Sequence, residues 1–218
     1  MPIIDKRNLI PEINRGGGRG LILGAGRTRE IAGDITTDLI DYPEVDIVGD
    51  LYEVLGQIGE ARLERLYAAH LIEHIEQPQR LLAEVARVLN DGGRATFIAP
   101  HFSNPFFYSD PTHRAFFGLY SFCYLAVDKV GFRRTVPDYV RNPELHLVEV
   151  RLVFRSYRPN YLRHGMFKVW ERVFNATRWM QELYEEIFSH GIGCYEVRYV
   201  VEARKGDAGA SPHPPPGM

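Results

Sequence analysis

Leu21-Ile22-Leu23-Gly24-Ala25-Gly26, followed twelve residues later by Asp38, is the stretch of sequence that decides the fold. An apolar run that stops at Gly-x-Gly predicts a buried strand whose end exposes bare backbone, so that a ligand can approach closely. An acidic residue at the end of the next strand can accept hydrogen bonds from both hydroxyls of a ribose. The combination favours a nucleoside-containing ligand, although Gly-x-Gly also occurs in ordinary tight turns.

The composition is that of an ordinary globular protein. The chain has 218 residues, 45% of them hydrophobic and 25% charged, which is enough for one α/β domain with a substantial core. A net charge of -2 gives no reason to expect a nucleic-acid partner. Cys123 and Cys194 form no disulfide framework, and neither a membrane-spanning run nor a signal core is present. These features predict a cytoplasmic protein without integral membrane association.

Strands and helices alternate along most of the chain. Strands are expected at residues 20–23, 35–38, 45–48, 63–68, 94–99, 147–156 and 195–204, and helices at 51–63, 77–89, 115–130 and 161–190. Near-continuous apolar strands early in the chain are typical of a parallel sheet covered by helices. The last two strands lie closer to period two and are expected to form an antiparallel edge hairpin.

The two ends of the chain are expected to lie outside the domain. Residues 1–19 end near Gly16-Gly17-Gly18 and are predicted to be a flexible N-terminal arm. Residues 206–218, GDAGASPHPPPGM, have the composition of a disordered tail. A single domain would then cover residues 20–205, with a helical insert at about 157–191.

Several of these segments together resemble the class I S-adenosylmethionine-dependent methyltransferases. The resemblance rests on Gly24-Ala25-Gly26, Asp38, Gly49-Asp50 and residues 81–100, LLAEVARVLNDGGRATFIAP, and covers about residues 20–105. A helix L-x-E-x-x-R-V-L-x-x-G-G that runs directly into a strand is frequent in that family. The resemblance implies an α/β, Rossmann-like doubly wound fold. Its mostly parallel seven-stranded sheet would have an antiparallel edge strand and helices on both faces.

The resemblance also implies S-adenosylmethionine as cofactor and a role for individual residues. The glycine loop would lie beside the methionine part of the cofactor. Asp38 would bind the ribose hydroxyls, and Asp50 would bind the adenine amino group. Asp38 and Asp50 are alternatively turn or helix-cap residues. The expected cofactor-binding residues are Gly24, Ala25, Gly26, Asp38, Leu39, Asp50, Leu51, Ala69 and His70.

The first crossover departs from the family pattern. Ile22 stands where the family usually carries an acidic or amide residue, and Thr28 stands at the third glycine position. Asp38 follows Gly26 by only twelve positions, which is too short for a full helix and a strand. The sequence therefore does not decide which residues bind the carboxylate of the cofactor. Arg27 or Arg29 is a candidate, because a guanidinium can bind a carboxylate through two hydrogen bonds.

The loop 101–114, HFSNPFFYSDPTHR, is expected to bind the methyl acceptor, because it follows a strand at the carboxyl edge of the sheet. A neutral imidazole suits proton acceptance near pH 7, so His113 or His101 is the expected catalytic base, oriented by Asp110. Asn104, Tyr108 and Arg114 are expected to contact the acceptor. A similar Y-x-D-P-T-H-R run in small methyltransferases associated with bacterial surface polysaccharides favours a hydroxyl of a sugar or related metabolite. Asp110-Pro111 alternatively forms only a turn that caps the next helix.

Two further classes of function stay open. A degraded glycine motif is compatible with a non-catalytic cofactor-binding module. His70-Leu71-Ile72-Glu73-His74 matches H-x-x-E-H, so a zinc hydrolase is a remote alternative; no metal is otherwise expected. Aromatic residues of the helical insert are expected in the core or in a lid, with a homodimer face as the alternative.

Overall fold

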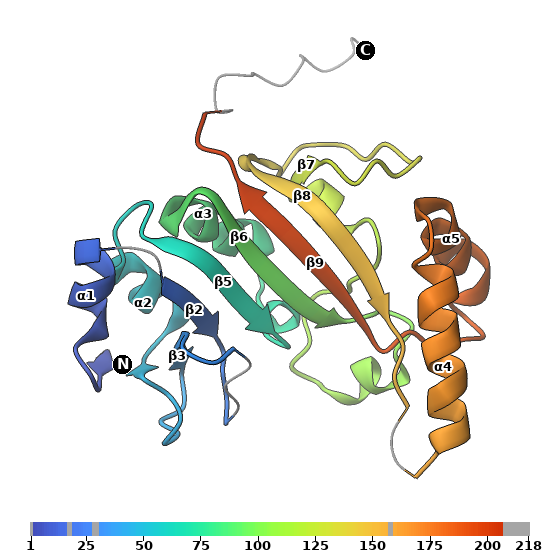
Figure 1. The fold of residues 1–218 in the computed structure, drawn as a ribbon, viewed down its shortest axis with the longest axis horizontal. Coiled ribbons are helices and arrows are strands. Elements are labelled where there is room, and N and C mark those ends of the chain that lie inside the picture. Colours follow the sequence, from blue (N-terminus) through green and yellow to red (C-terminus); the bar gives the residue numbers. More distant parts are fainter. Residues whose placement is uncertain (1, 17–18, 28–30, 157–158, 207–218) are drawn as a thin grey trace.

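The computed structural model describes residues 2–16, 19–27, 31–156 and 159–206. Within these residues nine strands form one sheet in the order β1-β4-β3-β2-β5-β6-β9-β8-β7 (Figure 1). The strands are β1 Ile4–Asp5, β2 Arg19–Leu23, β3 Ile35–Asp38, β4 Ile47–Val48, β5 Leu63–Ala69, β6 Leu89–Pro100, β7 Ala126–Asp128, β8 Asn142–Val153 and β9 Glu196–Ala203. The α-helices are α1 Leu9–Gly16, α2 Leu51–Gln57, α3 Pro78–Val88, α4 Tyr161–Phe174 and α5 Arg178–Leu183. Short 3₁₀ turns are η1 Ile72–His74, η2 Pro105–Ser109 and η3 Ser121–Tyr124, and a π-helical turn, η4, spans Tyr184–Phe188.

The strand directions confirm the doubly wound α/β fold. Strands β4, β3, β2, β5 and β6 are parallel, as are β7 and β8, whereas β9 runs antiparallel to both β6 and β8. The sheet has nine strands rather than the expected seven. Strand β9 lies inside the sheet, and the antiparallel strand at an edge is β1, which pairs with β4.

The expectation of a flexible N-terminal arm is wrong for the described residues 2–16. Helix α1 buries Leu9 and Ile13, which lie four residues apart and therefore share one face of the helix. The carboxylate of Asp5 accepts hydrogen bonds from the N–H groups of Leu9 and Ile10, each at 2.8 Å. Asp5 thus begins the helix, and the helix packs into the core. Residues 17 and 18 and most of the expected tail, 207–218, lie outside the described residues.

The segment 115–130 is not the expected helix. It contains η3 and β7, and its apolar residues pack around the sheet instead of forming one helix face. The ring of Phe122 stacks on that of Tyr199 in β9, with centroids 4.1 Å apart and planes 19° apart. Tertiary packing of aromatic rings therefore overrides the local helical pattern.

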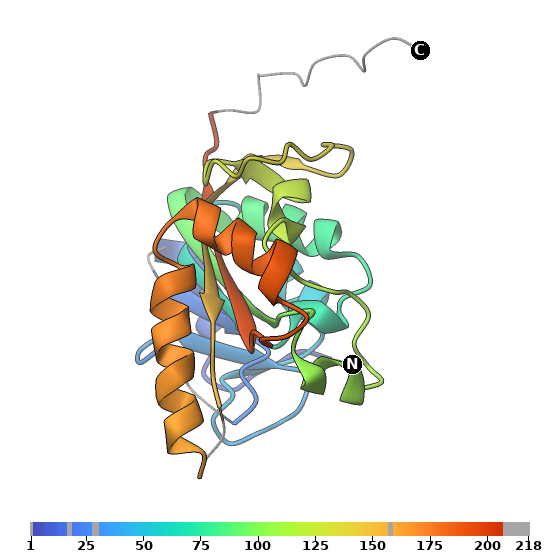
Figure 2. The ribbon, with the colours of Figure 1, turned by 90° about the vertical axis from the view of Figure 1, so that its right-hand side faces the viewer.

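Helix α3 lies behind the middle of the sheet, and the other α-helices lie toward its two ends (Figure 1). Helices α1 and α2 lie beside β2 and β3, whereas α4 and α5 lie at the opposite end (Figure 1). Helix α4 runs along β8 (Figure 2), where Asn175, just after α4, bonds the backbone of Leu152. None of the helices within the described residues combines the length and the apolar composition needed to cross a bilayer.

The ion pair between Asp34 and Arg65 packs beside β2, next to the short connection from β2 to β3. Residues 24–27 and 31–34, the described part of the crossover to β3, contain no helix. Asp34 is buried, and Nε of Arg65 donates to both of its carboxylate oxygens, each at 3.0 Å. A Cβ on Gly20 would lie 2.1 Å from Oδ2 of Asp34. The short crossover therefore depends on the absence of a side chain at Gly20.

We predict that Gly20→Ala lowers the free energy of unfolding by about 1–3 kcal/mol, because the added methyl group overpacks the Asp34–Arg65 pair. The matched control is Gly56→Ala in α2, where a Cβ would meet nothing within 4 Å. Alanine there raises the free energy of unfolding by about 0.5–1 kcal/mol. Denaturant unfolding of both variants measures the two effects. Equal stability of Gly20→Ala and the unmodified protein would contradict this account of the crossover.

Candidate active site

The glycine loop lies at the carboxyl end of β2. Gly24 and Gly26 have φ angles of +63° and +56°, which glycine adopts without strain. A Cβ on Gly24 would lie 3.2 Å from Cδ1 of Leu71, whereas one on Gly26 would meet nothing within 4 Å. Gly24 is therefore required by packing, and Gly26 leaves its main chain open to a ligand.

Asp38 holds this loop against the end of β3. Its Oδ2 accepts the N–H of Gly26 and its Oδ1 the N–H of Ile40, both at 2.8 Å. The N–H of Ala25 donates to the carbonyl of Thr37 at 3.0 Å. A carboxylate offers about four lone-pair sites, so Asp38 can still accept hydrogen bonds from a ligand. The open glycine backbone and this carboxylate fit a nucleoside cofactor.

Asp50 has the capping role that the sequence left as an alternative. Its Oδ1 accepts the N–H groups of Tyr52 and Glu53, at 2.9 and 3.2 Å, and so begins α2. The cap uses one of the two carboxylate oxygens, which leaves a role for Oδ2 toward an adenine. Leu51 beside it is half-buried, while Leu39 is exposed.

His70 follows the half-buried Ala69 at the end of β5. Its φ angle is +53°, a left-handed conformation that is uncommon outside glycine and is frequent at functional sites. Its Nε2 lies 3.0 Å from Oε1 of Glu196, and its Nδ1 lies 3.5 Å from Oε1 of Glu73. Hydrogen bonding to Glu196 and then to Glu73 raises the pKa of His70 to about 9. At neutral pH His70 is therefore an imidazolium that donates hydrogen bonds.

Sequence reasoning missed Glu196. It lies 126 residues after His70, at the start of β9, and only the strand order brings the two together. No local pattern marks this pairing, because a single glutamate at a strand end is ordinary.

The loop 101–114, expected to bind the acceptor, folds back onto η1. The N–H groups of Arg114 and Ala115 donate to the carbonyl of Glu73, at 2.7 and 3.3 Å. The rings of His74 and His113 lie with centroids 4.9 Å apart. The loop is therefore fixed to the end of β5, and His113 stands next to the turn that carries Glu73 and His74.

His113 is oriented by a backbone carbonyl rather than by Asp110. Its Nδ1 lies 2.8 Å from the carbonyl oxygen of Phe107, whereas its Nε2 lies 3.7 Å from Oδ2 of Asp110, beyond hydrogen-bonding distance. Asp110 accepts the Oγ1–H and N–H of Thr112, at 2.6 and 2.8 Å, and these bonds lower the pKa of Asp110. Asp110 thus makes only an ion-pair contact with His113, and its hydrogen bonds form a turn with Thr112.

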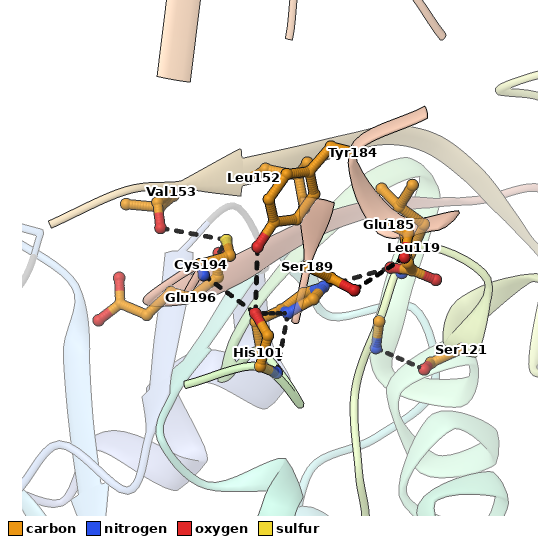
Figure 3. A network of polar contacts seen from close by, with 12 residues as sticks. His101, Leu119, Ser121, Leu152, Val153, Tyr184, Glu185, Ser189, Cys194 and Glu196 are labelled. Atoms are coloured by element: carbon orange, nitrogen blue, oxygen red, sulfur yellow. Dashed lines mark hydrogen bonds and ion pairs between the residues drawn. The ribbon is translucent and has the colours of Figure 1, made fainter. Parts of the chain in front are cut away.

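The surroundings of His101 do not favour a role as a base. Its side chain is fully buried, with Nδ1 accepting the N–H of Ser103 at 3.1 Å and Nε2 lying 3.2 Å from Oε2 of Glu185 (Figure 3). Glu185 in turn accepts the N–H of Leu119 at 2.6 Å. Both ring nitrogens are therefore committed to holding the strand end, η4 and the 117–121 segment together.

The three expected acceptor-binding residues have different surroundings. Asn104 is buried; its Nδ2 donates to the carbonyl of Tyr195 at 2.9 Å, and its Oδ1 accepts the N–H of Phe106 at 3.0 Å. Asn104 therefore shapes the loop and is not placed to contact an acceptor. Tyr108 and Arg114 are exposed, although the Tyr108 hydroxyl donates to the carbonyl of Phe102 at 2.9 Å.

The helical zinc geometry of the H-x-x-E-H alternative does not form. The turn η1 spans only Ile72–His74, and His70 precedes it in a left-handed conformation. His70 points its nitrogens at Glu196 and Glu73. His70 and His74 therefore share no helix face, and the paired-histidine grip that this alternative requires does not form.

A cavity of about 500 Å³ lies between α4 and the loops around residues 103–106 and 189–195. Its lining includes Arg155, Arg163, Phe167, Trp170, His190 and Tyr195. The guanidinium of Arg155 reaches within 4.0 Å of Glu196, the partner of His70. The cavity thus borders the His70 end of the site. Phe167 and Trp170 belong to the helical insert, whose aromatic residues were expected in the core or in a lid over the pocket, and both line this cavity.

Comparisons with known proteins agree with this geometry. A protein-family model described as a methyltransferase domain matches residues 22–97. A S-adenosylmethionine-dependent methyltransferase from Archaeoglobus fulgidus superposes with a TM-score of 0.53 at 15% identity, covering 90% of each chain. Phosphoethanolamine N-methyltransferase 2 of Haemonchus contortus, solved with S-adenosyl-L-methionine, gives 0.46 at 10% identity and covers 87% of this chain and 49% of its own. A methyltransferase from Mesorhizobium loti gives 0.45 at 12% identity, covering 91% and 99%. No curated protein sequence matches the chain significantly.

Residues 22–97 match the methyltransferase domain, and the fold of the described residues is that of S-adenosylmethionine-dependent methyltransferases. These similarities indicate S-adenosylmethionine as the cofactor. The fold places the glycine loop, Asp38 and Asp50 at the ends of neighbouring parallel strands, as a site for this cofactor requires.

We predict that Asp38→Ala lowers the affinity for S-adenosylmethionine at least about tenfold, because hydrogen bonds to a charged group contribute about 1.5–3 kcal/mol each. The matched control is Asp41→Ala, whose exposed carboxylate pairs with Lys6 at 2.6 Å. Calorimetric titration of both variants with S-adenosylmethionine measures the affinity. A loss of the same size in Asp41→Ala would contradict the assignment of the ribose site to Asp38.

Proposed function

We propose that the protein methylates a hydroxyl oxygen of a small polar acceptor, a sugar or a related metabolite. When bound, S-adenosylmethionine supplies a methyl carbon that is electrophilic because it is attached to a sulfonium. The observation that supports a hydroxyl acceptor is the free Nε2 side of His113 next to the turn after β5. An alcohol must lose its proton during methyl transfer, and a neutral imidazole accepts a proton well near pH 7.

The orientation of His113 suits proton acceptance. A carbonyl oxygen only accepts hydrogen bonds, so the contact with Phe107 places the imidazole proton on Nδ1. Nε2 of the neutral ring then carries the lone pair. In the proposed step, the acceptor oxygen bonds the methyl carbon, the C–S bond breaks with its electron pair returning to sulfur, and Nε2 of His113 takes the hydroxyl proton. Alignment of the reactants by the fixed loop supplies much of the remaining rate enhancement.

The cavity beside α4 supports an anionic sugar as acceptor. Arg155 and Arg163 bring two guanidinium groups to its lining, and guanidinium groups bind phosphate well. Phe167 and Trp170 offer flat faces, with ring centroids 5.4 Å apart, on which a sugar ring can pack. We therefore propose a phosphate-bearing sugar, such as a nucleotide sugar, as the acceptor class.

The test is a screen of nucleotide sugars and sugar phosphates for acceptor-dependent formation of S-adenosylhomocysteine. With an acceptor found, His113→Ala is predicted to lower kcat by about 10²-fold, the size expected for loss of a general base, without changing the affinity for S-adenosylmethionine. The matched control is His164→Ala in α4, which keeps the full kcat. Unchanged kcat in His113→Ala would remove His113 as the base.

We propose in addition that the enzyme forms a homodimer through α4. Phe174 is buried, and Phe167 and Trp170 pack against the core, so one face of the helix covers the domain. Four exposed apolar residues follow one another at spacings of four, three and four: Leu162, Met166, Val169 and Val173. This spacing is that of a seam between two paired helices. A Cβ on Gly165, beside this seam, would meet nothing within 4 Å, which leaves room for a second helix.

Val169→Glu is predicted to convert the dimer to a monomer, because it places a charge in the middle of the seam. Light scattering after gel filtration measures the mass, with about 50 kDa expected for a dimer of this 25.0 kDa chain. Val140→Glu, also exposed but outside α4, is the matched control and stays dimeric. A mass near one chain for the unmodified protein would refute the dimer.

A further inference from the structure

Three metal-binding side chains converge where the acceptor loop meets η1. One nitrogen of His74, one nitrogen of His113 and one carboxylate oxygen of Glu73 lie within 4.8 Å of one another. Glu73 is 1% exposed, and its Oε2 has no hydrogen-bond partner among the described residues. A buried carboxylate oxygen without a partner is costly, and a cation beside it would remove that cost.

The hydrogen bonds around His74 fix its tautomer. Its Nδ1 lies 2.9 Å from Oγ1 of Thr112, and that hydroxyl lies 2.6 Å from Oδ1 of Asp110. The ionised carboxylate of Asp110 only accepts, so the single proton of the Thr112 hydroxyl is donated to it. Thr112 must then accept from His74, which places the imidazole proton on Nδ1. Nε2 of His74 therefore carries the lone pair.

The same logic applies to His113, whose Nδ1 donates to the carbonyl of Phe107 and whose Nε2 is a lone-pair donor. Both imidazoles thus have one nitrogen held by a protein oxygen and the other available. This is the arrangement of metal-binding histidines, whose second nitrogen almost always donates to a carbonyl, hydroxyl or carboxylate partner. Oε1 of Glu73 faces His70, which leaves Oε2 for the ligand role.

We propose that Glu73, His74 and His113 bind a divalent transition-metal ion of the zinc type. Two imidazoles and a carboxylate are the ligand set of catalytic zinc sites, which keep further positions open. Ligand atoms around tetrahedral zinc lie about 3.3 Å apart at typical bond lengths. Small side-chain rotations would bring the three ligand atoms, which lie within 4.8 Å of one another, to this distance. Asp110, with Oδ2 3.7 Å from Nε2 of His113, adds negative charge at the rim.

The role of the ion rests on the proposed function. An acceptor hydroxyl that binds the ion at an open position loses its proton to water at a lower pH than a free alcohol does. Its oxygen then bonds the methyl carbon as the C–S bond breaks and its electron pair returns to sulfur. His113 would in that case activate the hydroxyl as a metal ligand instead of taking the proton itself. The H-x-x-E-H segment contributes Glu73 and His74, and its first histidine stays outside the ligand set.

The test is titration of chelator-treated protein with Zn²⁺ and, as a spectroscopic probe, Co²⁺, in the absence of cofactor and acceptor. We expect one ion per chain at micromolar or tighter affinity and visible Co²⁺ absorption bands of low-coordinate geometry. Glu73→Gln, His74→Asn and His113→Asn are each expected to weaken binding at least tenfold. The matched control His190→Ala, an exposed histidine in the α4 cavity, leaves binding unchanged.

A fourth variant separates ligand loss from misfolding. Thr112 is exposed and is not a ligand, so Thr112→Val is expected to leave the fold intact. Loss of its contact with His74 is expected to weaken metal binding about tenfold, the usual effect of removing such a partner, whereas Thr112→Ser restores it. Absence of stoichiometric binding, or equal binding by all these variants, overturns the metal site. Titration with S-adenosylmethionine is independent: protein that binds the cofactor but no metal refutes this inference alone, and protein that binds metal here but no cofactor refutes the proposed function alone.

Discussion

The shortness of the first crossover is the constraint on which the rest of the structure depends. Only eleven residues, 24–34, join the end of β2 to the start of β3. The buried carboxylate of Asp34, paired with the exposed Arg65, fills the space over Gly20. The carboxylate of Asp38 then ties the glycine loop to the end of β3. The proposed cofactor site therefore consists of a loop and two carboxylates, with no helix in the described part of the crossover.

The acceptor side is assembled by long-range hydrogen bonds. The loop 105–114 is fixed to the turn after β5 through the carbonyl of Glu73, and His70 is held by Glu196 from β9. Because β9 inserts between β6 and β8, it brings a carboxylate to the end of the parallel strands from the far end of the chain. The imidazoles of His70, His74 and His113 thus have distinct states: His70 donates, whereas the other two present lone pairs.

Local sequence pattern predicted the strand ends at which the proposed cofactor site lies. Gly24, Gly26 and Asp38 stand at strand ends, and the strand that precedes each follows from apolar runs of a few residues. The difference between His101 and His113 had no local signal, because the burial of His101 depends on Glu185, 84 residues away. The helix predicted for residues 115–130 does not form for a similar reason: the stacking of Phe122 on Tyr199 joins η3 to the last strand. Helix α1 was missed because Pro11 and the following glycines obscured the short Leu9–Ile13 face.

The central claim is that a short crossover and a histidine-bearing loop form one methyl-transfer site. A crystal structure of the protein with S-adenosylhomocysteine tests it most directly. The account predicts the ribose hydroxyls on Asp38, the methionine part over Gly26, and the sulfur directed toward the space between His70 and His113. A ligand bound elsewhere, or a glycine loop that must be displaced before the ligand can bind, would contradict the account.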